Sequence, residues 1–367
     1  MSTTATGAGR PVITAWSAVS PLGIGRTAFT EGVREGRSTA VPLGPEAGNV
    51  PEDTACLVPS FDIRALLGRK GTRSMDRVTG LVVTAVGALL DDTERNRAVG
   101  TGEAAALALG TTTGSVQSMV DFTRDSLTGE RPYFVDPARF PNAVMNCAAG
   151  QSAIRYQLKG PNTTLAGGRT SGLHALNYAR RLLAAGRAQT VLCGAAEEYS
   201  ASRAWLEHHS GDGTPTPPLG EGCAMLLVEP ARADDGDQPV LAELLAVELG
   251  VCLGGDVQEA LARCLGRALE RAGAGPEDVA VLARSGAPGP EGDGEVAAVR
   301  EVLAEAEYAD VTPAGLLGDT GAAGAAFQVA ALLTYAQDRP DQAAGKVGVI
   351  TAVDRAGTLG CALLRLR

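Results

Sequence analysis

The sequence predicts a layered α/β fold built from two similar halves, and three observations carry this prediction. Short runs of β-branched or apolar residues alternate with alanine-rich segments, which is typical of buried strands covered by helices. The 367 residues exceed the usual size of one hydrophobic core. Each half also contains a glycine-rich turn that leads into a helix of small residues, at 167–182 and at 318–333. A duplicated unit that stacks these two helices back to back explains the pattern.

The individual elements follow from local composition. Strands are predicted where short β-branched or apolar runs are bounded by turn residues, at 12–16, 105–109, 163–166, 190–194, 224–229, 240–248, 279–283, 346–353 and 361–366. Helices are predicted where longer, alanine-rich segments lie between them, at 77–91, 171–185, 257–272, 295–305 and 322–336. The polar, turn-rich segment 229–239 forms a natural joint, so the predicted domains are 1–230 and 239–367.

Composition and charge exclude several classes of function. The formal net charge is −10, which disfavours nucleic acid and anionic membranes as main partners. Residues 1–10 are small and polar, without the apolar stretch of a secretory signal, and the longest apolar runs are too short to cross a bilayer. The seven cysteines show no CxxC spacing, so we expect reduced, buried thiols in a cytoplasmic protein. No metal site is predicted, because only His174, His208 and His209 supply imidazoles.

The segment 163–176 has the form of a strand, a tight turn and a helix start. It is similar to the nucleophile elbow of β-ketoacyl synthases, in which Thr-Ala-Cys-Ser-Ser-Gly-Leu-His-Ala is a common form. The position of the family's cysteine holds Arg169. A guanidinium cannot act as a nucleophile at any pH that a cell visits. The segment therefore resembles a condensing-enzyme elbow without its acyl-carrying thiol.

Further segments resemble the same family in the family's own order along nearly the whole chain. They are 11–23, which is similar to the opening VVITGxGxxSPLG, and 34–38, 75–78, 140–146, 159–164 and 194–198, the last corresponding to GGxE. Together these segments imply the thiolase-like fold of the family. That fold is a five-layered αβαβα body made of two similar halves.

The departures from the family's pattern imply a silent catalytic site. The family's first histidine, in HGTGT, corresponds to Ser285 within 283–293. Its second histidine, in KSxxGHxxGAAG, corresponds to Gly318 or Asp319, since 313–324 is one residue short. Decarboxylative condensation needs a thiolate that holds the acyl chain and donors that stabilise the enolate. Because the thiol and both imidazoles are missing, the resemblance implies no catalytic residues in this chain.

Type II polyketide systems of this family pair an active ketosynthase with a homologous chain length factor that lacks the cysteine. The resemblance implies that this chain is such a non-catalytic subunit, which shapes the acyl tunnel of a cysteine-bearing partner and limits polyketide chain length. The family's dimer continues one sheet through the strand that lies here at 163–166. The tunnel is expected to be closed by large apolar side chains between 110 and 145, namely Met119, Phe122, Phe134 and Met145.

The same resemblance implies no cofactor for this chain. Its partner would act on phosphopantetheine-bound acyl chains of an acyl carrier protein. Carrier proteins are acidic and this chain is acidic too, so we expect the carrier protein to dock mainly on the partner.

Two other functions remain open at this stage. One is a diverged condensing or acyl-transfer enzyme with a different nucleophile, for which Cys147 is the available candidate. The other is a scaffold subunit that only stabilises an active ketosynthase. The Arg169 side chain is also open to two descriptions: it points into water, or it is buried and paired with Glu197, Glu198 or a partner's carboxylate, because an unpaired buried charge is too costly.

Overall fold

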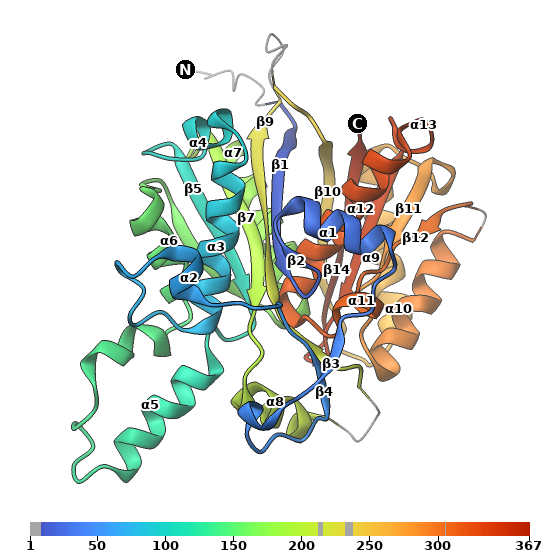
Figure 1. Ribbon diagram of the computed structural model, residues 1–367. Helices are drawn as coiled ribbons and strands as arrows, with labels where there is room; N and C mark the ends of the chain where they lie inside the picture. Colours follow the sequence, from blue (N-terminus) through green and yellow to red (C-terminus); the bar gives the residue numbers. More distant parts are fainter. Residues whose placement is uncertain (1–8, 212–215, 232–237, 305) are drawn as a thin grey trace, which may run out of the picture.

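The structure is a computed structural model that describes residues 9–211, 216–231, 238–304 and 306–367 (Figure 1). Its largest sheet runs through both halves of the chain, and each half contributes a set of strands to it. The first half supplies β1 (Pro11–Ser20), β5 (Ala105–Thr111), β6 (Asn162–Ala166), β7 (Thr190–Glu197) and β9 (Gly222–Pro230). The second half supplies β10 (Ala242–Val251), β11 (Val279–Ala283), β12 (Ala309–Asp310), β13 (Val347–Val353) and β14 (Thr358–Leu366).

The two sets of strands have the same topology. The order of the strands in the sheet is β1–β9–β7–β5–β6 in the first half and β10–β14–β13–β11–β12 in the second. If the five strands of each half are numbered 1 to 5 along the chain, both halves have the order 1–5–4–2–3. In both halves the first two pairings are antiparallel and the last two are parallel. The halves join where β1 pairs with β10. The predicted α/β fold of two similar halves is therefore confirmed.

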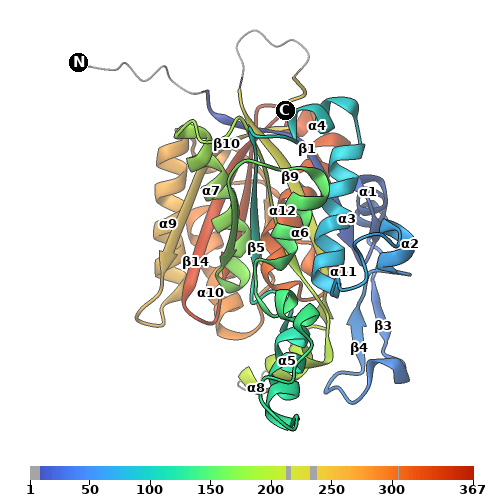
Figure 2. The ribbon, with the colours of Figure 1, turned by 90° about the vertical axis from the view of Figure 1, so that its left-hand side faces the viewer.

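Helices complete a five-layered body. Helices α7 (Ser171–Ala184) and α12 (Gly324–Asp338) contact strands of both halves and form the middle layer. Helices α3 (Arg77–Asp91) and α6 (Cys147–Tyr156) cover the outer side of the first half, and α9 (Val257–Ala272) and α10 (Gly289–Val302) cover that of the second (Figure 2). Three large clusters of buried apolar side chains fill the spaces between these layers.

The middle layer depends on small residues. A Cβ atom at Gly172 would lie 2.9 Å from the Cβ of Ala325, which is closer than real Cβ contacts. Glycine at this position therefore lets α7 and α12 pack back to back, as the paired glycine-rich turns predicted.

The remaining elements are short or peripheral. The helices are α1 (Arg26–Arg34), α2 (Ile63–Leu67), α4 (Glu94–Val99), α5 (Val116–Thr128), α8 (Ala201–Ser210), α11 (Ala314–Leu317) and α13 (Pro340–Ala343). The 3₁₀ turns are η1 (Pro45–Ala47), η2 (Pro137–Ala143), η3 (Gly168–Thr170), η4 (Pro276–Asp278) and η5 (Gly321–Ala323). The strand β2 (Gly23–Ile24) pairs with β1, and β3 (Ala40–Pro42), β4 (Thr54–Cys56) and β8 (Leu219–Gly220) form a small separate sheet.

Two differences from the predicted elements have physical reasons. Helix α10 begins at Gly289, six residues before the predicted start at 295, because a proline in its first turn favours helix initiation there. Helix α5 was not predicted, since Val116 is its one buried residue and it lacks the apolar stripe of a core-facing helix. The predicted joint at 229–239 includes 232–237, which lie outside the described residues, so the domain boundary stays a prediction.

Residues 116–146 form an arm that projects from the layered body (Figures 1 and 2). Within it, α5 packs against η2, where the rings of Phe122 and Phe140 lie 5.7 Å apart, and α5 also contacts α8. The helices in the described part of the chain include none that is both long and apolar enough to span a membrane.

Candidate functional site

Arg169 lies in the tight turn that the sequence predicted, between β6 and α7. The turn passes through Gly168, whose φ of +56° is in the left-handed region that favours glycine. A Cβ at this position would lie 2.1 Å from Oδ2 of Asp354, so a side chain here would also displace that carboxylate. The backbone N–H of Arg169 donates to the same Asp354 oxygen at 2.9 Å. A carboxylate of the protein therefore already binds the N–H of the turn that leads into α7.

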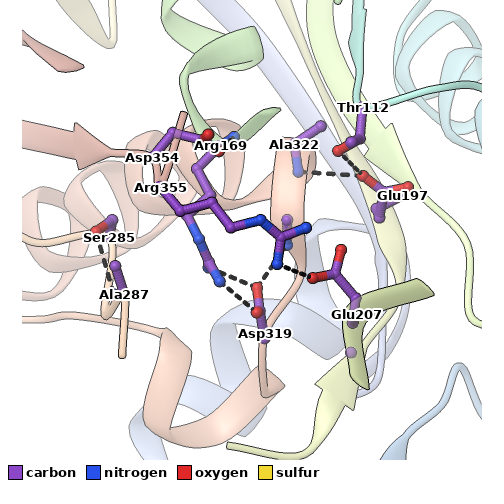
Figure 3. A network of polar contacts seen from close by, with 12 residues as sticks. Thr112, Arg169, Glu197, Glu207, Ser285, Ala287, Asp319, Ala322, Asp354 and Arg355 are labelled. Atoms are coloured by element: carbon purple, nitrogen blue, oxygen red, sulfur yellow. Dashed lines mark hydrogen bonds and ion pairs between the residues drawn. The ribbon is translucent and has the colours of Figure 1, made fainter. Parts of the chain in front are cut away.

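The guanidinium of Arg169 forms a two-pronged ion pair with Asp319. Nη1 donates to Oδ1 at 2.6 Å and Nη2 donates to Oδ2 (Figure 3). Asp319 is buried and also accepts from the backbone N–H of Gly321 at 3.0 Å. Burial alone would raise the pKa of Asp319, but the charge and hydrogen bonds of Arg169 outweigh burial and lower it to about 2. Both groups are thus ionised at neutral pH.

This pairing corrects one prediction. Arg169 is largely buried and paired with a carboxylate, as one of the two descriptions had it, but its partner is Asp319 and not Glu197 or Glu198. Glu197 instead accepts from the hydroxyl of Thr112 and from the backbone N–H of Ala322, at 3.3 Å in the second case. The reason is the duplicated architecture: the glycine-rich turn of the first half faces the equivalent turn of the second, so Arg169 meets Asp319.

The positions that correspond to the nucleophile and the two histidines surround one small cavity. Arg169, Ser285 and Asp319 all line a space of about 10 Å³, which is roughly the room needed for one water molecule. Of the two candidates for the second histidine position, Asp319 faces this cavity. Gly318 has a φ of +71° and its Cβ direction meets the carbonyl oxygen of Pro218 at 2.4 Å.

Ser285 is held by a buried carboxylate rather than left free to react. Its Oγ donates to Oε2 of Glu295 at 2.6 Å and its N–H donates to Oε1 at 2.9 Å. Thr351 donates a third hydrogen bond to Glu295 at 2.6 Å. Burial raises the pKa of Glu295 despite these donors. Ser285 therefore fixes a structural carboxyl group and does not replace an imidazole.

Two further groups complete the site, and sequence reasoning missed both. Arg203 on α8 is buried and donates to three main-chain oxygens, those of Glu198, Gly220 and Asp319, at 2.7–3.0 Å. Arg355 pairs with Glu207 at 2.8 Å beside the Arg169–Asp319 pair (Figure 3). An arginine in a polar helix gives no sequence signal of burial.

The other candidate reactive residues have structural surroundings. Cys147 is the first residue of α6, and its Sγ donates to Oδ1 of Asn142 at 3.3 Å. Burial and the nearby charge of Asp76 raise the pKa of Cys147, so the reactive thiolate is disfavoured. The rings of His208 and His209 lie 5.6 and 5.4 Å from Trp205. Among the described residues, no group of three or more His, Cys, Asp or Glu side chains could hold a metal ion.

The expected tunnel residues all lie on the arm. Met119, Phe134 and Met145 are exposed, with 41%, 55% and 44% of their surface accessible, whereas Phe122 is half-buried against Phe140. They belong to a larger set of exposed apolar side chains on the arm: Met119, Val120, Leu127, Tyr133, Phe134, Phe140, Val144 and Met145. Exposed apolar side chains in such a concentration are typical of interaction surfaces, and the four expected tunnel residues are not ordinary core.

Comparisons with known proteins identify the family to which this sequence is similar. Residues 10–233 match the family model described as beta-ketoacyl synthase, N-terminal domain. The chain is similar to 3-oxoacyl-[acyl-carrier-protein] synthase 2 of Coxiella burnetii, with 26% identity over 82% of this chain and 78% of that protein. The protein of the same name from Vibrio cholerae is 25% identical over 89% of this chain and 85% of that protein.

Two solved structures extend the comparison. The ishigamide ketosynthase/chain length factor is 46% identical, with a TM-score of 0.89 over 98% of this chain and 99% of that chain. A type II polyketide acyl-carrier protein in complex with its ketosynthase matches at 18% identity and a TM-score of 0.82, over 98% and 100% of the respective chains. The second match concerns the fold alone.

Proposed function

Because this chain belongs to the β-ketoacyl synthase family, we propose that it is the non-catalytic chain length factor of a type II polyketide ketosynthase heterodimer. One observation carries the proposal: an ion pair of Arg169 and Asp319 stands where the family has a thiol and an imidazole. The remaining space of about 10 Å³ has no room for an acyl thioester. The similarity to a ketosynthase/chain length factor at 46% identity supports the same role.

Within the heterodimer the chain would act through its arm and its sheet edge. Strand β6 lies at the edge of the sheet and pairs with β5 on one side. None of the described strands pairs with its other edge, which is therefore available to a partner subunit. The arm lies on the same half of the molecule as β6 (Figure 2). It carries the exposed apolar side chains described above. Met119, Phe122, Phe134 and Met145 would close the partner's acyl tunnel and stop extension by steric exclusion.

No cofactor is proposed for this chain. The cysteine-bearing partner would act on phosphopantetheine-bound acyl chains, and the acyl carrier protein would dock mainly on that partner, because the net charge of −10 repels an acidic protein. The cytoplasm is the proposed location, where seven free cysteines stay reduced.

The competing function is a condensing or acyl-transfer enzyme, which the similarity to 3-oxoacyl synthases favours. Its nucleophile would be Cys147, and the raised pKa of this thiol argues against it. A third possibility is a scaffold subunit that does not contact the acyl chain. Analysis of the polyketide products distinguishes it from a chain length factor, because only substitutions in a chain length factor would change the product length.

Incubation of the isolated chain with an acyl-carrier thioester is expected to give no covalent acyl adduct, since the described site offers no free nucleophile. Intact-protein mass spectrometry checks this result. A cysteine-bearing ketosynthase in the same assay serves as the control and should gain the acyl mass. A stable adduct on any cysteine of this chain would overturn the proposal of a silent subunit.

Association with a cysteine-bearing ketosynthase is expected to depend on the apolar side chains of the arm. Phe134→Ser should weaken the complex about tenfold or more, as for an aromatic residue at the centre of an interface. Leu253→Ser is the matched control, because Leu253 is 95% exposed in the loop between β10 and α9, which belongs to the second half of the chain and not to the arm. Sedimentation velocity of mixtures measures the affinity. A monodisperse monomer that ignores the ketosynthase at micromolar concentration would count against the heterodimer.

A further inference from the structure

Arg203 is a buried cation that joins three separate segments of the chain. It lies in the first turn of α8 and is 3% exposed. Its guanidinium donates to the main-chain oxygens of Glu198 at 2.9 Å, of Gly220 at 2.7 Å and of Asp319 at 3.0 Å. Glu198 directly follows β7, Gly220 belongs to β8, and Asp319 lies in the second half of the chain. The rigid fork of donors on an arginine therefore fixes these three segments relative to one another.

Hydrogen bonds, rather than a large apolar contact, attach the start of α5 to the body. Val116 is the one residue of α5 that is buried. The side chain of Ser115 and the backbone N–H of Gln117 donate to Oε1 of Glu198 at 3.0 and 3.4 Å. The side-chain oxygen of Gln117 accepts from the backbone N–H of Ser202 at 3.2 Å. The position of the first turn of α5 therefore depends on where Glu198 and Ser202 lie.

Both of these attachment points are direct neighbours of Arg203. Glu198 accepts from Arg203 through its main-chain oxygen and from the first turn of α5 through its carboxylate. Ser202 precedes Arg203 in α8, and α8 contacts α5 (Figure 2). A continuous hydrogen-bonded route therefore runs from Asp319 in the second half, through Arg203, to the start of the arm.

We propose that Arg203 is a positioning residue for the arm, which fixes α5 relative to the second half of the chain and thereby determines where the arm's apolar side chains stand in the partner's acyl tunnel. The role in the tunnel rests on the proposed function, whereas the position of α5 is a property of this chain alone. Without the guanidinium, the oxygens of Glu198, Gly220 and Asp319 lose a donor inside the protein, where an unsatisfied acceptor is costly. The segments relieve that cost by shifting, and the first turn of α5 shifts with them.

Hydrogen exchange of the full chain, in the assembly in which it purifies, tests the position of α5. Arg203→Met keeps the length of the side chain but removes its donors. Protection of 116–128 should fall about tenfold or more, as expected for the loss of one charge-assisted hydrogen bond. Protection of α9, on the outer side of the second half, should change much less, whereas a residue that only stabilised the fold would lower both alike. Arg203→Lys keeps the charge and an N–H donor and should recover part of the protection.

A second variant interrupts the same route at its other end. Gln117 is half-buried, so Gln117→Leu should fold normally, and it removes the acceptor of the Ser202 N–H. Protection of 116–128 should fall in this variant too. Because both substitutions interrupt one route, the double variant should be as protected as Arg203→Met alone, whereas independent effects would multiply. Thr123→Ala, at an exposed position of the same helix, is the matched control and should not lower protection.

Product length in the reconstituted pair with a ketosynthase gives a readout that a loss of stability alone does not move. Arg203→Met and Gln117→Leu should each broaden the products to both shorter and longer polyketides, because the wall keeps its volume but loses its fixed position. Shortening Met119 or Phe122 removes volume instead and should lengthen the products only.

Two results would overturn the positioning role. One is a loss of protection of 116–128 in Arg203→Met that is absent or no greater than the loss in α9. The other, decisive if that variant does not fold, is wild-type protection of 116–128 in Gln117→Leu. If both variants loosen α5 and the pair still makes wild-type products, Arg203 positions the arm but the arm forms no tunnel wall, which contradicts the proposed function instead.

Discussion

Replacing Asp319 by alanine is expected to lower the free energy of unfolding by about 3 kcal/mol at pH 7, because it leaves the guanidinium of Arg169 without its counter-charge. Loss of one partner of a buried ion pair costs about 3–5 kcal/mol in general. The Arg169 side chain keeps 19% of its surface accessible, which places the expected loss at the lower end of that range. Urea unfolding followed by circular dichroism gives the measurement.

Two companion variants identify the cause of this loss. Replacing both Arg169 and Asp319 by leucine should restore most of the stability, since an apolar pair of suitable volume replaces a buried ion pair at little cost. Glu259→Ala removes the exposed pair with Arg263 and should cost no more than about 0.5 kcal/mol. If Asp319→Ala costs as little as this control, the ion pair does not hold the two halves together.

The same pair has a defined acid response. The pKa of Asp319 is lowered from 3.8 to about 2, so its contribution to stability is present above pH 3.8 and is lost as the pH falls through 2. The difference between wild type and Asp319→Ala should accordingly stay constant from pH 8 down to about pH 5 and shrink only in strong acid.

Shortening Met119 or Phe122 to alanine is expected to lengthen the polyketide made by the reconstituted pair by about one two-carbon unit, because the deleted atoms leave room for about two chain carbons. Met119 is exposed in this chain, so Met119→Ala should cost less than about 1 kcal/mol of its stability. Phe122→Ala should cost more, since that ring packs on Phe140. Mass analysis of the released products measures chain length.

The control for this experiment is Leu253→Ala, an exposed apolar residue outside the arm. It should leave the products unchanged. If alanine variants of Met119, Phe122, Phe134 and Met145 all fold, pair normally and give the wild-type products, the tunnel assignment is wrong. A scaffold subunit would then be the better description.

The sequence predicted the repeated architecture better than the contacts within the site. Runs of β-branched residues and the two glycine-rich turns depend on local pattern, and α3, α9 and β11 have the predicted bounds. The partner of Arg169 depends instead on which loops face each other across the two halves, which no local pattern contains. Helix α5 escaped prediction for a related reason: its apolar side chains point outward, so they do not mark a core-facing stripe.

The repeated strand order has a consequence for how the protein unfolds. A duplicated chain could in principle lose one copy while the other persists. Here the innermost layer belongs to neither copy alone: α7 fits against α12 at Gly172 and Ala325, and the ion pair of Arg169 with Asp319 links one copy to the other. The core of each copy is therefore complete only when the other copy is folded against it. The molecule should behave as a single cooperative unit in spite of its internal symmetry.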